Sequence, residues 1–318
     1  MALAEFELID RFFRSQDSKN SSTVLGVGDD CALVEVTKEE VLAITTDSMV
    51  EGVHFSPEID PEFLGYKALA VNLSDLAAMG AKPCWATLAL TMPTADEEWL
   101  QQFSAGFCGL AEFYSLDLIG GDTTQGPLNI TVQAMGLVPS DARAMLRCSA
   151  CVGDSIYVTG RIGDSGLGLK ILSGEFESSD LSAIARLHRP SPRVEAGLRI
   201  RSVANACIDV SDGLVSDLWH ILKSSQVGAT IFWENIPISG ALKKYVETTD
   251  DWTMPLTAGD DYELCFTVPV ANENRLHRSM INAECSYTRI GVIDKKKGLR
   301  VMKESEQIDF RSQGFVHF

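Results

Sequence analysis

The sequence lacks any run of the roughly 18 or more apolar residues that a membrane-spanning helix requires, so no membrane span is expected. Its first residues lack a basic region followed by an apolar stretch, so no secretory signal is indicated and we expect the protein in the cytoplasm. Basic residues are scarce: 27 Lys and Arg stand against 44 Asp and Glu, a formal net charge of −17. Such an acidic surface repels the phosphate backbone of nucleic acid, which argues against nucleic-acid partners.

Familiar nucleotide-binding and hydrolase motifs are also missing. The glycines between residues 160 and 168 do not form GxxxxGK[ST], because Leu169 stands where the lysine is needed. Gly26-Val27-Gly28-Asp29 lacks the third glycine of a dinucleotide loop and places an acid where pyrophosphate would approach. Gly163-Asp164-Ser165-Gly166 has no patterned histidine or second acid around it, so a serine hydrolase is not indicated.

Cysteine does not provide a framework for the fold. The eight cysteines are scattered through a chain of 318 residues, too long to need disulfides. The C-x-x-C spacing of Cys148 and Cys151 has no second pair or nearby histidines to complete a zinc site. We interpret most cysteines as small core residues. A length of 318 residues with 45% hydrophobic residues predicts about two domains, each with its own core.

The organisation of the chain changes near residues 139 to 153, where a strand-like run gives way to a polar stretch before the next strand-like run. We therefore predict an N-terminal domain of residues 1–140 and a C-terminal domain of residues 150–318. Strand-like and helical patterns alternate on both sides, at residues 41–46, 61–79, 96–114 and 118–119 and at 156–159, 166–172, 206–210, 211–223 and 263–268. Both halves are predicted to be α/β or α+β.

What the sequence does contain is a set of short acidic segments, each with a carboxylate beside a glycine or a hydroxyl residue. These segments are Gly28-Asp29-Asp30, Thr45-Thr46-Asp47, Gly120-Gly121-Asp122, residues 209–213 and Gly259-Asp260-Asp261, together with Asp75 in a helical pattern. Mg²⁺ prefers such oxygens and is commonly held by one or two carboxylates together with substrate phosphates. The segments indicate an enzyme that handles a polyphosphate through several metal ions. The acidic net charge does not exclude ATP, because bound Mg²⁺ reverses the local sign.

Asp75 lies in an unusual position for a charged residue. At about 100° per residue, it falls on the same apolar helix stripe as Leu64 and Val71. A buried ionised carboxylate must be protonated, paired with a cation or bound to metal. A salt bridge to Lys67 or Lys82 explains the position as well as metal does; the other acidic segments favour metal.

Two further segments are predicted to follow strands. Thr45 and Asp47 point the same way at a strand end, where the carbonyl of Thr46 is free, although Asp47 capping the next turn explains the pattern too. The paired glycines before Asp122 allow backbone to approach a phosphate closely, although Gly-Asp is also ordinary turn chemistry.

Residues 209–213 join a strand-like segment to a helical apolar stripe formed by Leu214, Leu218, Ile221 and Leu222. Ser211 is the predicted N-cap, and exposed amides at the helix start favour an anionic phosphate. Asp209 and Asp212 would then lie near the same phosphate and need metal between them. Capping explains Ser211 and Asp212 equally well but leaves Asp209 without a role.

Together, six motifs resemble the thiamine-monophosphate kinase family of the aminoimidazole ribonucleotide synthetase-like superfamily. They occur in the family's order and spacing, and the resemblance extends to the last residues of the chain. The motifs lie at residues 25–33, 45–55, 67–81, 120–123, 209–214 and 259–264. The extension at residues 50–55 favours this family over aminoimidazole ribonucleotide synthetase, selenophosphate synthetase and the hydrogenase-maturation ATPases.

The resemblance implies ATP-dependent phosphorylation of thiamine phosphate to thiamine diphosphate, the last step in synthesis of the vitamin B1 cofactor. It implies a two-domain α/β (α+β) fold and a homodimer in which the N-terminal sheets form a barrel, with the nucleotide in the cleft at that interface. The N-terminal domain would bind metal and ATP and form the dimer. The C-terminal α/β domain would complete the ATP and substrate site.

The resemblance also implies roles for individual residues. Those implied to bind Mg²⁺ are Asp30, Thr45, Thr46, Asp47, Asp75, Asp122, Asp209 and Asp212. Those implied to contact ATP are Tyr114, Gly121, Asp122, Arg147 and Ser211. Those implied to hold thiamine phosphate are His54, Glu263 and Phe315, where Tyr or Trp is expected at least as often as Phe at the last position.

These implied roles are chemically reasonable. The guanidinium of Arg147 suits two phosphate oxygens. Glu263 would face the cationic thiamine or accept from its aminopyrimidine, Phe315 would stack on a ring and His54 would donate to the substrate phosphate. The expected mechanism is direct in-line transfer, in which an anionic phosphate oxygen attacks the γ-phosphoryl group, so no catalytic protein nucleophile or base is expected.

Two interpretations from other classes remain open, a metal-dependent phosphatase and a non-catalytic cation-binding protein. The phosphatase would release phosphate without ATP, and the cation-binding protein gives no reason for Arg147. Within the superfamily, an aminoimidazole ribonucleotide synthetase-like enzyme is the alternative.

Overall fold

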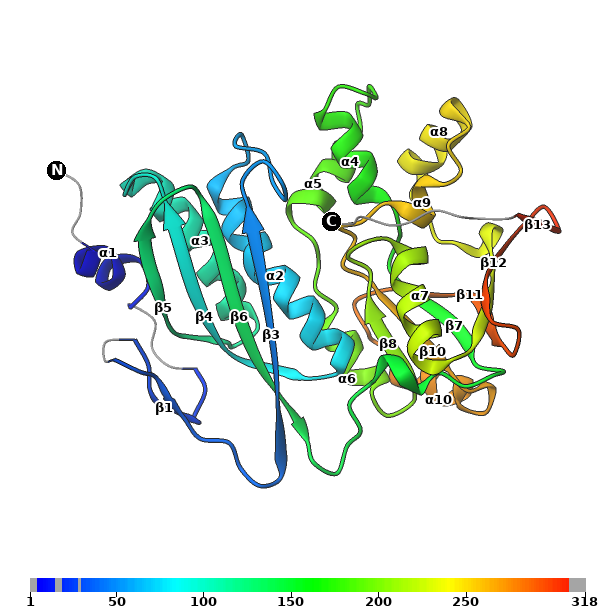
Figure 1. The fold of residues 1–318 in the computed structure, drawn as a ribbon, viewed down its shortest axis with the longest axis horizontal. Coiled ribbons are helices and arrows are strands. Elements are labelled where there is room, and N and C mark those ends of the chain that lie inside the picture. Colours follow the sequence, from blue (N-terminus) through cyan, green and yellow to red (C-terminus); the bar gives the residue numbers. More distant parts are fainter. Residues whose placement is uncertain (1–4, 15–18, 28–29, 309–318) are drawn as a thin grey trace. The chain divides into compact units, whose positions relative to one another are not determined.

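A computed structural model describes residues 5–14, 19–27 and 30–308 of the chain. The chain separates into two compact units at Asp141 and Ala142, and the helix end Ala77–Gly80 is grouped with the second unit (Figure 1). Both units combine helices and strands, as the sequence predicts. None of the described helices has the length and apolar character needed to cross a membrane.

The first unit is built on a four-stranded sheet of order β3-β6-β4-β5. Its elements are α1 (Glu5–Phe12), β1 (Thr23–Leu25), β2 (Leu33–Val34), β3 (Glu40–Val50), α2 (Pro61–Met79), β4 (Lys82–Met92), α3 (Glu97–Phe113), β5 (Asp117–Gln125) and β6 (Asn129–Pro139). Strands β4 and β5 are parallel and α3 connects them, whereas β6 pairs antiparallel with both β3 and β4.

The two faces of this sheet have different surroundings. Helices α2 and α3 cover one face, toward which the buried residues Leu88 and Val132 point (Figure 1). Their neighbours in the strands, Ala89 and Thr131, are paired in register and face the other way. Near one end of that second face, a cluster around Trp85 packs with residues of β2 and the preceding turn. We call the α2 and α3 side the helix face and the other side the open face.

Helices α2 and α3 approach each other closely because each presents a glycine to the other's backbone. A Cβ built on Gly65 of α2 would lie 2.0 Å from the carbonyl oxygen of Phe103, and one built on Gly106 of α3 would lie 1.9 Å from that of Glu62. Any larger side chain therefore forces the helices apart. The close approach helps to bury α2 on nearly all sides.

The second unit contains a seven-stranded sheet of order β13-β12-β9-β11-β7-β10-β8. Only the β12–β9 pair is parallel among the described pairs of this sheet. Its strands are β7 (Ser155–Thr159), β8 (Ala206–Asp209), β9 (Gly228–Phe232), β10 (Leu264–Val268), β11 (Tyr287–Asp294), β12 (Gly298–Lys303) and β13 (Glu306–Ile308). Its helices are η1 (Arg147–Ser149), α4 (Asp164–Leu172), α5 (Ser182–His188), α6 (Val194–Ile200), α7 (Leu214–Ser225), η2 (Trp233–Asn235), α8 (Gly240–Thr249), α9 (Met254–Thr257), η3 (Val270–Asn272) and α10 (Glu273–Ser279).

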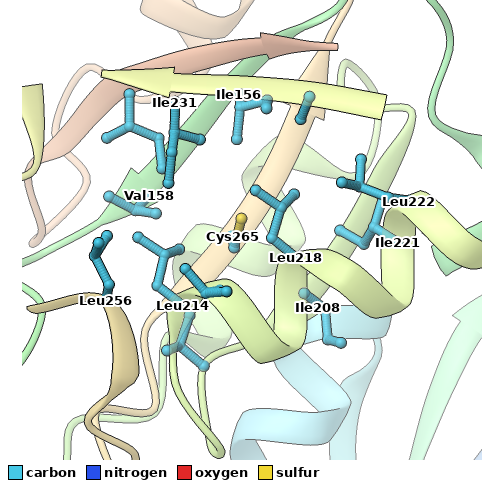
Figure 2. Packing of buried hydrophobic residues seen from close by; sticks show 14 of the residues in the cluster. Ile156, Val158, Ile208, Leu214, Leu218, Ile221, Leu222, Ile231, Leu256 and Cys265 are labelled. Carbon is cyan, nitrogen blue, oxygen red and sulfur yellow. The ribbon is translucent and has the colours of Figure 1, made fainter. Parts of the chain in front are cut away.

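Helix α7 packs its apolar stripe against this sheet, as Figure 2 shows. The four residues predicted for the stripe, beginning with Leu214, are all buried. They face Ile156, Ile208 and Cys265 from three different strands. Cys265 is fully buried and free, and Cys84 and Cys207 are buried too, but Cys31, Cys148 and Cys151 are exposed, so the interpretation of most cysteines as core residues was wrong.

The periodic patterns predicted the long helices well but underestimated two strands. The helix predicted at residues 61–79 is α2, and the one predicted at 96–114 is α3 with Asp96 as its N-cap. The prediction that residues 45–47 end a strand was wrong, because β3 continues to Val50 and pairs with β6 along its whole length. The prediction that residues 120–122 follow a strand was also wrong, because they lie within β5.

The glycine contact between α2 and α3 predicts the effect of an added methyl group. Gly106→Ala is expected to lower the free energy of unfolding by about 1–3 kcal/mol, because the new Cβ overlaps the carbonyl of Glu62. Gly109→Ala on the same helix meets no atom within 4 Å and is expected to raise it by about 0.5–1 kcal/mol. Urea denaturation of both variants measures the two changes in the free energy of unfolding. A Gly106→Ala variant more stable than the wild type would contradict the packing argument.

Candidate active site

A pair of carboxylates lies between the sheet and α2 in the first unit. Thr45 and Asp47 alternate with exposed residues along β3 and point toward the helix face, as the strand pattern predicts. There the hydroxyl of Thr45 donates to a carboxylate oxygen of Asp75 on α2. Burial and the charge of Asp75 raise the pKa of Asp47 to about 6. Two carboxylates in mutual repulsion beside a hydroxyl are a suitable set of oxygens for a divalent cation.

Other predicted residues of this unit lie on the open face. Thr46 is exposed there, and its hydroxyl oxygen accepts from Nε2 of Gln133 at 3.3 Å. Asp122 is exposed in β5 and pairs in register with Ala89, which also faces the open side. Gly121 precedes it so close to β4 that a Cβ would lie 1.9 Å from the carbonyl of Leu88. Because β3 and β5 are opposite edges of the sheet, one copy does not bring Asp122 to the carboxylate pair.

Three more predicted residues lie in turns of the first unit. His54 is half-buried, and its Nδ1 accepts the backbone N–H of Val50 at 3.0 Å. This bond requires the tautomer that carries hydrogen on Nε2, so Nε2 is a donor. Tyr114 caps the end of α3, half-buried, with its ring edge-on to the exposed Phe113. Asp30 is exposed between β1 and β2.

In the second unit, the turn from β8 to α7 corrects the sequence-based hypothesis. Ser211 is not the N-cap, because α7 begins at Leu214 and Gly213 occupies the cap position without a side-chain cap. The amides that were expected to face a phosphate instead donate to Oδ2 of Asp217, at 3.1 Å from Ser211, 3.0 Å from Asp212 and 3.1 Å from Gly213. The cause is the carboxylate on the first turn of α7, which the motif did not reveal.

A second acidic loop, residues 259–262, lies against this turn and holds it from the other side. The backbone N–H of Asp260 donates to the carbonyl of Ser211, and that of Tyr262 donates to the carbonyl of Val210, both at 2.8 Å. Asp260 and Tyr262 both have positive φ, 65° and 50°, a conformation that costs free energy for residues other than glycine. A Cβ at Gly259 would lie 2.4 Å from the Ser211 carbonyl, so the loops touch where that glycine stands.

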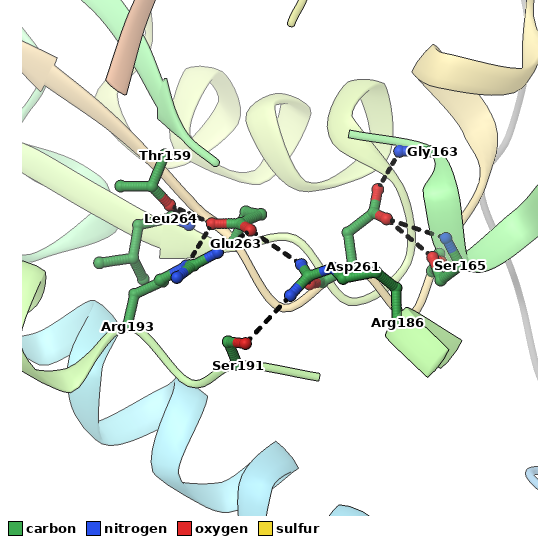
Figure 3. Close-up of polar contacts among 10 residues, drawn as sticks. Thr159, Gly163, Ser165, Arg186, Ser191, Arg193, Asp261, Glu263 and Leu264 are labelled. Carbon is green, nitrogen blue, oxygen red and sulfur yellow. Dashed lines mark hydrogen bonds and ion pairs between the residues drawn. The ribbon is translucent and has the colours of Figure 1, made fainter. Parts of the chain in front are cut away.

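Glu263, predicted to hold thiamine phosphate, is fully buried at the start of a strand among donors of the second unit (Figure 3). Arg193 binds it through Nε and Nη2 at 2.7 and 2.5 Å. Arg186 adds a bond of 2.8 Å and Thr159 one of 2.6 Å. These contacts support a role in which Glu263 holds the two arginines in place. Direct contact between Glu263 and the substrate stays a prediction.

Asp261, two residues before Glu263, belongs to the same polar group (Figure 3). Its oxygens accept from the backbone N–H of Gly163 at 2.6 Å and contact the Ser165 hydroxyl at 2.7 Å. Burial raises the pKa of Asp261 to about 7. The Ser165 hydroxyl also lies 2.6 Å from the carbonyl of Gly259 and has a single hydrogen. A protonated Asp261 that donates to Ser165 lets both contacts be hydrogen bonds.

The remaining predicted residues are placed as follows. Arg147 is exposed at the start of η1, and its carbonyl accepts from the Ser225 hydroxyl at 2.8 Å. Asp209 is buried at the end of β8, paired with Leu264. Phe315 lies outside the described residues.

Sequence reasoning missed three residues that support these loops, Arg186, Arg193 and Asp217, and it named Asp261 in an acidic segment without giving it a role. The signal for Asp217 was present, since an acid on the first turn of a helix is a common partner for preceding amides. The two arginines follow no acidic motif, so only their contact with Glu263 reveals them.

A metal site made by protein side chains alone is absent from the described part of the chain, where no three His, Cys, Asp or Glu side chains come close enough together. A pair such as Asp47 and Asp75 is what proteins commonly contribute to Mg²⁺ when phosphate oxygens complete the coordination. The residues present therefore fit an ion that binds together with a phosphorylated ligand.

Comparison with known proteins extends this description. The family models for AIR synthase related proteins match residues 28–138 (N-terminal domain) and 152–304 (C-terminal domain). Thiamine-monophosphate kinase of Escherichia coli K12 is 47% identical over 100% of this chain and 99% of that protein. The structure of thiamine-monophosphate kinase from Stenotrophomonas maltophilia K279a is similar with a TM-score of 0.86 and 43% identity, over 95% of this chain and 97% of that one. AaThiL complexed with AMPPCP and TMP is similar with a TM-score of 0.78 and 34% identity, over 100% of this chain and 99% of that one.

The ion pairs of Glu263 lead to a stability prediction. Glu263→Gln is expected to lower the free energy of unfolding by about 3–5 kcal/mol, because two largely buried guanidinium groups lose their counter-charge. The matched control is Glu195→Gln, which removes an exposed ion pair with Arg199 and is expected to have a small effect. Thermal or urea unfolding checks both variants. Equal stability of the two would refute a structural role for the buried pairs.

Proposed function

The chain belongs to the thiamine-monophosphate kinase family of AIR synthase related proteins, and from this we infer that it catalyses ATP-dependent phosphorylation of thiamine phosphate to thiamine diphosphate. The observation that carries this inference is its full-length similarity to AaThiL complexed with AMPPCP and TMP, an ATP analogue and the substrate for which the family is named. The reaction is the last step in the synthesis of thiamine diphosphate.

Mg²⁺ is the metal that we propose for this reaction. On the helix face it would be held by Thr45, Asp47 and Asp75, and the cation would relieve the repulsion between the two carboxylates. The further proposed ligands are Asp30, Thr46, Asp122, Asp209 and Asp212. When bound, Mg²⁺ supplies positive charge that screens the repulsion between two phosphorylated substrates.

The side chains of this protein contribute binding and orientation. With its hydrogen on Nε2, His54 is prepared to donate to the phosphate of thiamine phosphate. The proposed ATP contacts are Tyr114, Gly121, Asp122, Arg147 and Ser211. The remaining proposed contacts of thiamine phosphate are Glu263 and Phe315. The attacking phosphate oxygen is already anionic, so we assign no protein nucleophile or general base.

A homodimer is the second part of the proposal, with the N-terminal units joined through their sheets into a barrel. The edge position of β3, with Val41 and Ile44 exposed, supports it, because an uncovered edge strand of 11 residues readily pairs with another chain. The separation of Asp122 and Asp47 on opposite edges and faces supports it too. If both bind metal at one site, a second copy must supply one of them.

We place the reaction in the cytoplasm. All eight cysteines are free, which fits a reducing compartment.

The activity is tested by incubating the pure protein with ATP, Mg²⁺ and thiamine phosphate and measuring thiamine diphosphate and ADP. Equal amounts of the two products are expected. Free phosphate from thiamine phosphate without ATP would instead identify a phosphatase, and no turnover of any kind would leave only cation binding.

Loss of one member of the carboxylate pair should abolish most of this activity. Asp47→Asn is expected to lower kcat/KM by about 100-fold or more while the protein remains folded, because the metal loses a charged oxygen. The exposed Asp141→Asn is the control and is expected to retain full activity. Near-normal turnover of Asp47→Asn at saturating Mg²⁺ would contradict the assignment.

A mixing experiment tests whether the site is shared between copies. Asp47→Asn and Asp122→Asn are each expected to be inactive, and refolding them together should restore about a quarter of wild-type activity, because half of the dimers are mixed and one site of each is intact. Mixing Asp47→Asn with Asp75→Asn is the control and should restore nothing, since these residues lie in the same copy. No recovery in the first mixture would contradict a shared site.

A further inference from the structure

One buried carboxylate near the predicted phosphate contacts has no role in the proposed function. Asp217 lies in the first turn of α7 and is 2% exposed. Its Oδ2 accepts the backbone N–H groups of three successive residues, Ser211, Asp212 and Gly213, at 3.0 to 3.1 Å. Three donors directed at one carboxylate oxygen form a directional set of hydrogen bonds, which opposes the rise of the Asp217 pKa to about 7 caused by burial and the charge of Asp212.

This arrangement changes what the turn offers to a ligand. Successive backbone amides that converge on one point form a concave anion site, which in other proteins binds phosphate. Here the chain's own carboxylate occupies that site, so the amides of residues 211–213 are not free for ATP. Ser211 and Asp212 are half-exposed and can contact a ligand through their side chains.

The opposite side of the turn is also held. The carbonyls of Val210 and Ser211 accept from the second acidic loop, at 2.8 Å each. Gly213 has a φ of 118°, and a Cβ there would lie 2.7 Å from the carbonyl of Thr257. The carbonyls of Val210 and Ser211 therefore fix one side of the turn. The amides of residues 211–213, on the other side, are held by Asp217.

We propose that Asp217 is a positioning residue for the kinase reaction, holding the backbone of residues 211–213 so that the side chains of Ser211 and Asp212 meet ATP and its metal. The proposal rests on the proposed function for the identity of the ligands. It assigns no contact between Asp217 and any substrate. It also requires that the amides of residues 211–213 bind Asp217 and do not bind the nucleotide.

The variant Asp217→Asn tests this role, because asparagine has nearly the same shape but lacks the charge. We expect the apparent affinity for Mg²⁺–ATP to fall about tenfold or more, as three hydrogen bonds to a charged acceptor are weakened. The KM for thiamine phosphate is expected to stay within about twofold, because the three amides that Asp217 holds belong to none of the residues proposed to contact that substrate. Steady-state kinetics with each substrate varied at saturating levels of the other measures the split, well below the unfolding temperature.

The matched control is Asp154→Asn. Asp154 is equally buried, and its Oδ2 accepts the N–H of Cys151 at 3.0 Å. Its other partners are Asn205, which precedes β8, and the hydroxyl of Thr267, which pairs with the first residue of β8, so both lie at the opposite end of the strand from the turn. This variant is expected to lower the unfolding temperature without changing either KM. If Asp217→Asn does the same, or raises both KM values alike, the positioning role is overturned.

Hydrogen exchange gives a second test that uses the wild-type protein, so it does not require a variant to fold. The amides of residues 211–213 are expected to exchange slowly without nucleotide and to change little when ATP and Mg²⁺ are added. Rapid exchange that slows only with nucleotide would show that these amides bind phosphate, and would overturn the proposal. A wild-type protein that makes no thiamine diphosphate would refute the proposed function instead, while the exchange result would still decide whether Asp217 holds the turn.

Discussion

Burying negative charge is the constraint on which the acidic loops of this protein depend. Glu263 is satisfied by two arginines and a threonine hydroxyl, and Asp217 by three backbone amides. Asp261 is satisfied by a backbone amide and a hydroxyl. Burial also raises the pKa of Asp261 to about 7, which allows it to carry a proton. Each solution removes the cost of a buried charge by a different route.

Asp47 differs from these three residues. The two causes that act on its pKa, burial and the charge of Asp75, both favour the protonated form. Burial and the charge of Asp212 raise the pKa of Asp217 to about 7, and burial raises that of Asp261 to about 7, but in both residues hydrogen bonds oppose the rise. A carboxylate kept near another one at a cost to both is understandable if a cation binds there during the reaction. The hydrogen bonds that satisfy Asp217 and Asp261, and not the direction of their pKa shifts, thus distinguish these residues from Asp47.

The sequence predicted the long helices α2 and α3 and both units of the fold, because a long apolar segment bounded by polar and turn residues reflects burial directly. It underestimated β3 and β5, because threonine, aspartate and glycine look like turn residues until a neighbouring strand pairs with them. Local pattern found the acidic segments, whereas the roles of Tyr114, Arg147, His54, Glu263 and Phe315 came from the family resemblance. Glu263's two arginine partners could not have been found, since they lie 70 and 77 residues away in the chain.

The same constraint explains how a protein with a net charge of −17 can handle polyphosphates without a Walker loop. A phosphate loop neutralises its ligand with backbone amides and a lysine. In this chain, Leu169 stands at the lysine position of the glycine-rich segment, and the amides of residues 211–213 are already bound to Asp217. In the proposed site, the charge of the phosphates is met by Arg147 and by Mg²⁺ that arrives with the nucleotide. Under that proposal, the carboxylates that repel a bare phosphate become its binding site once Mg²⁺ is present.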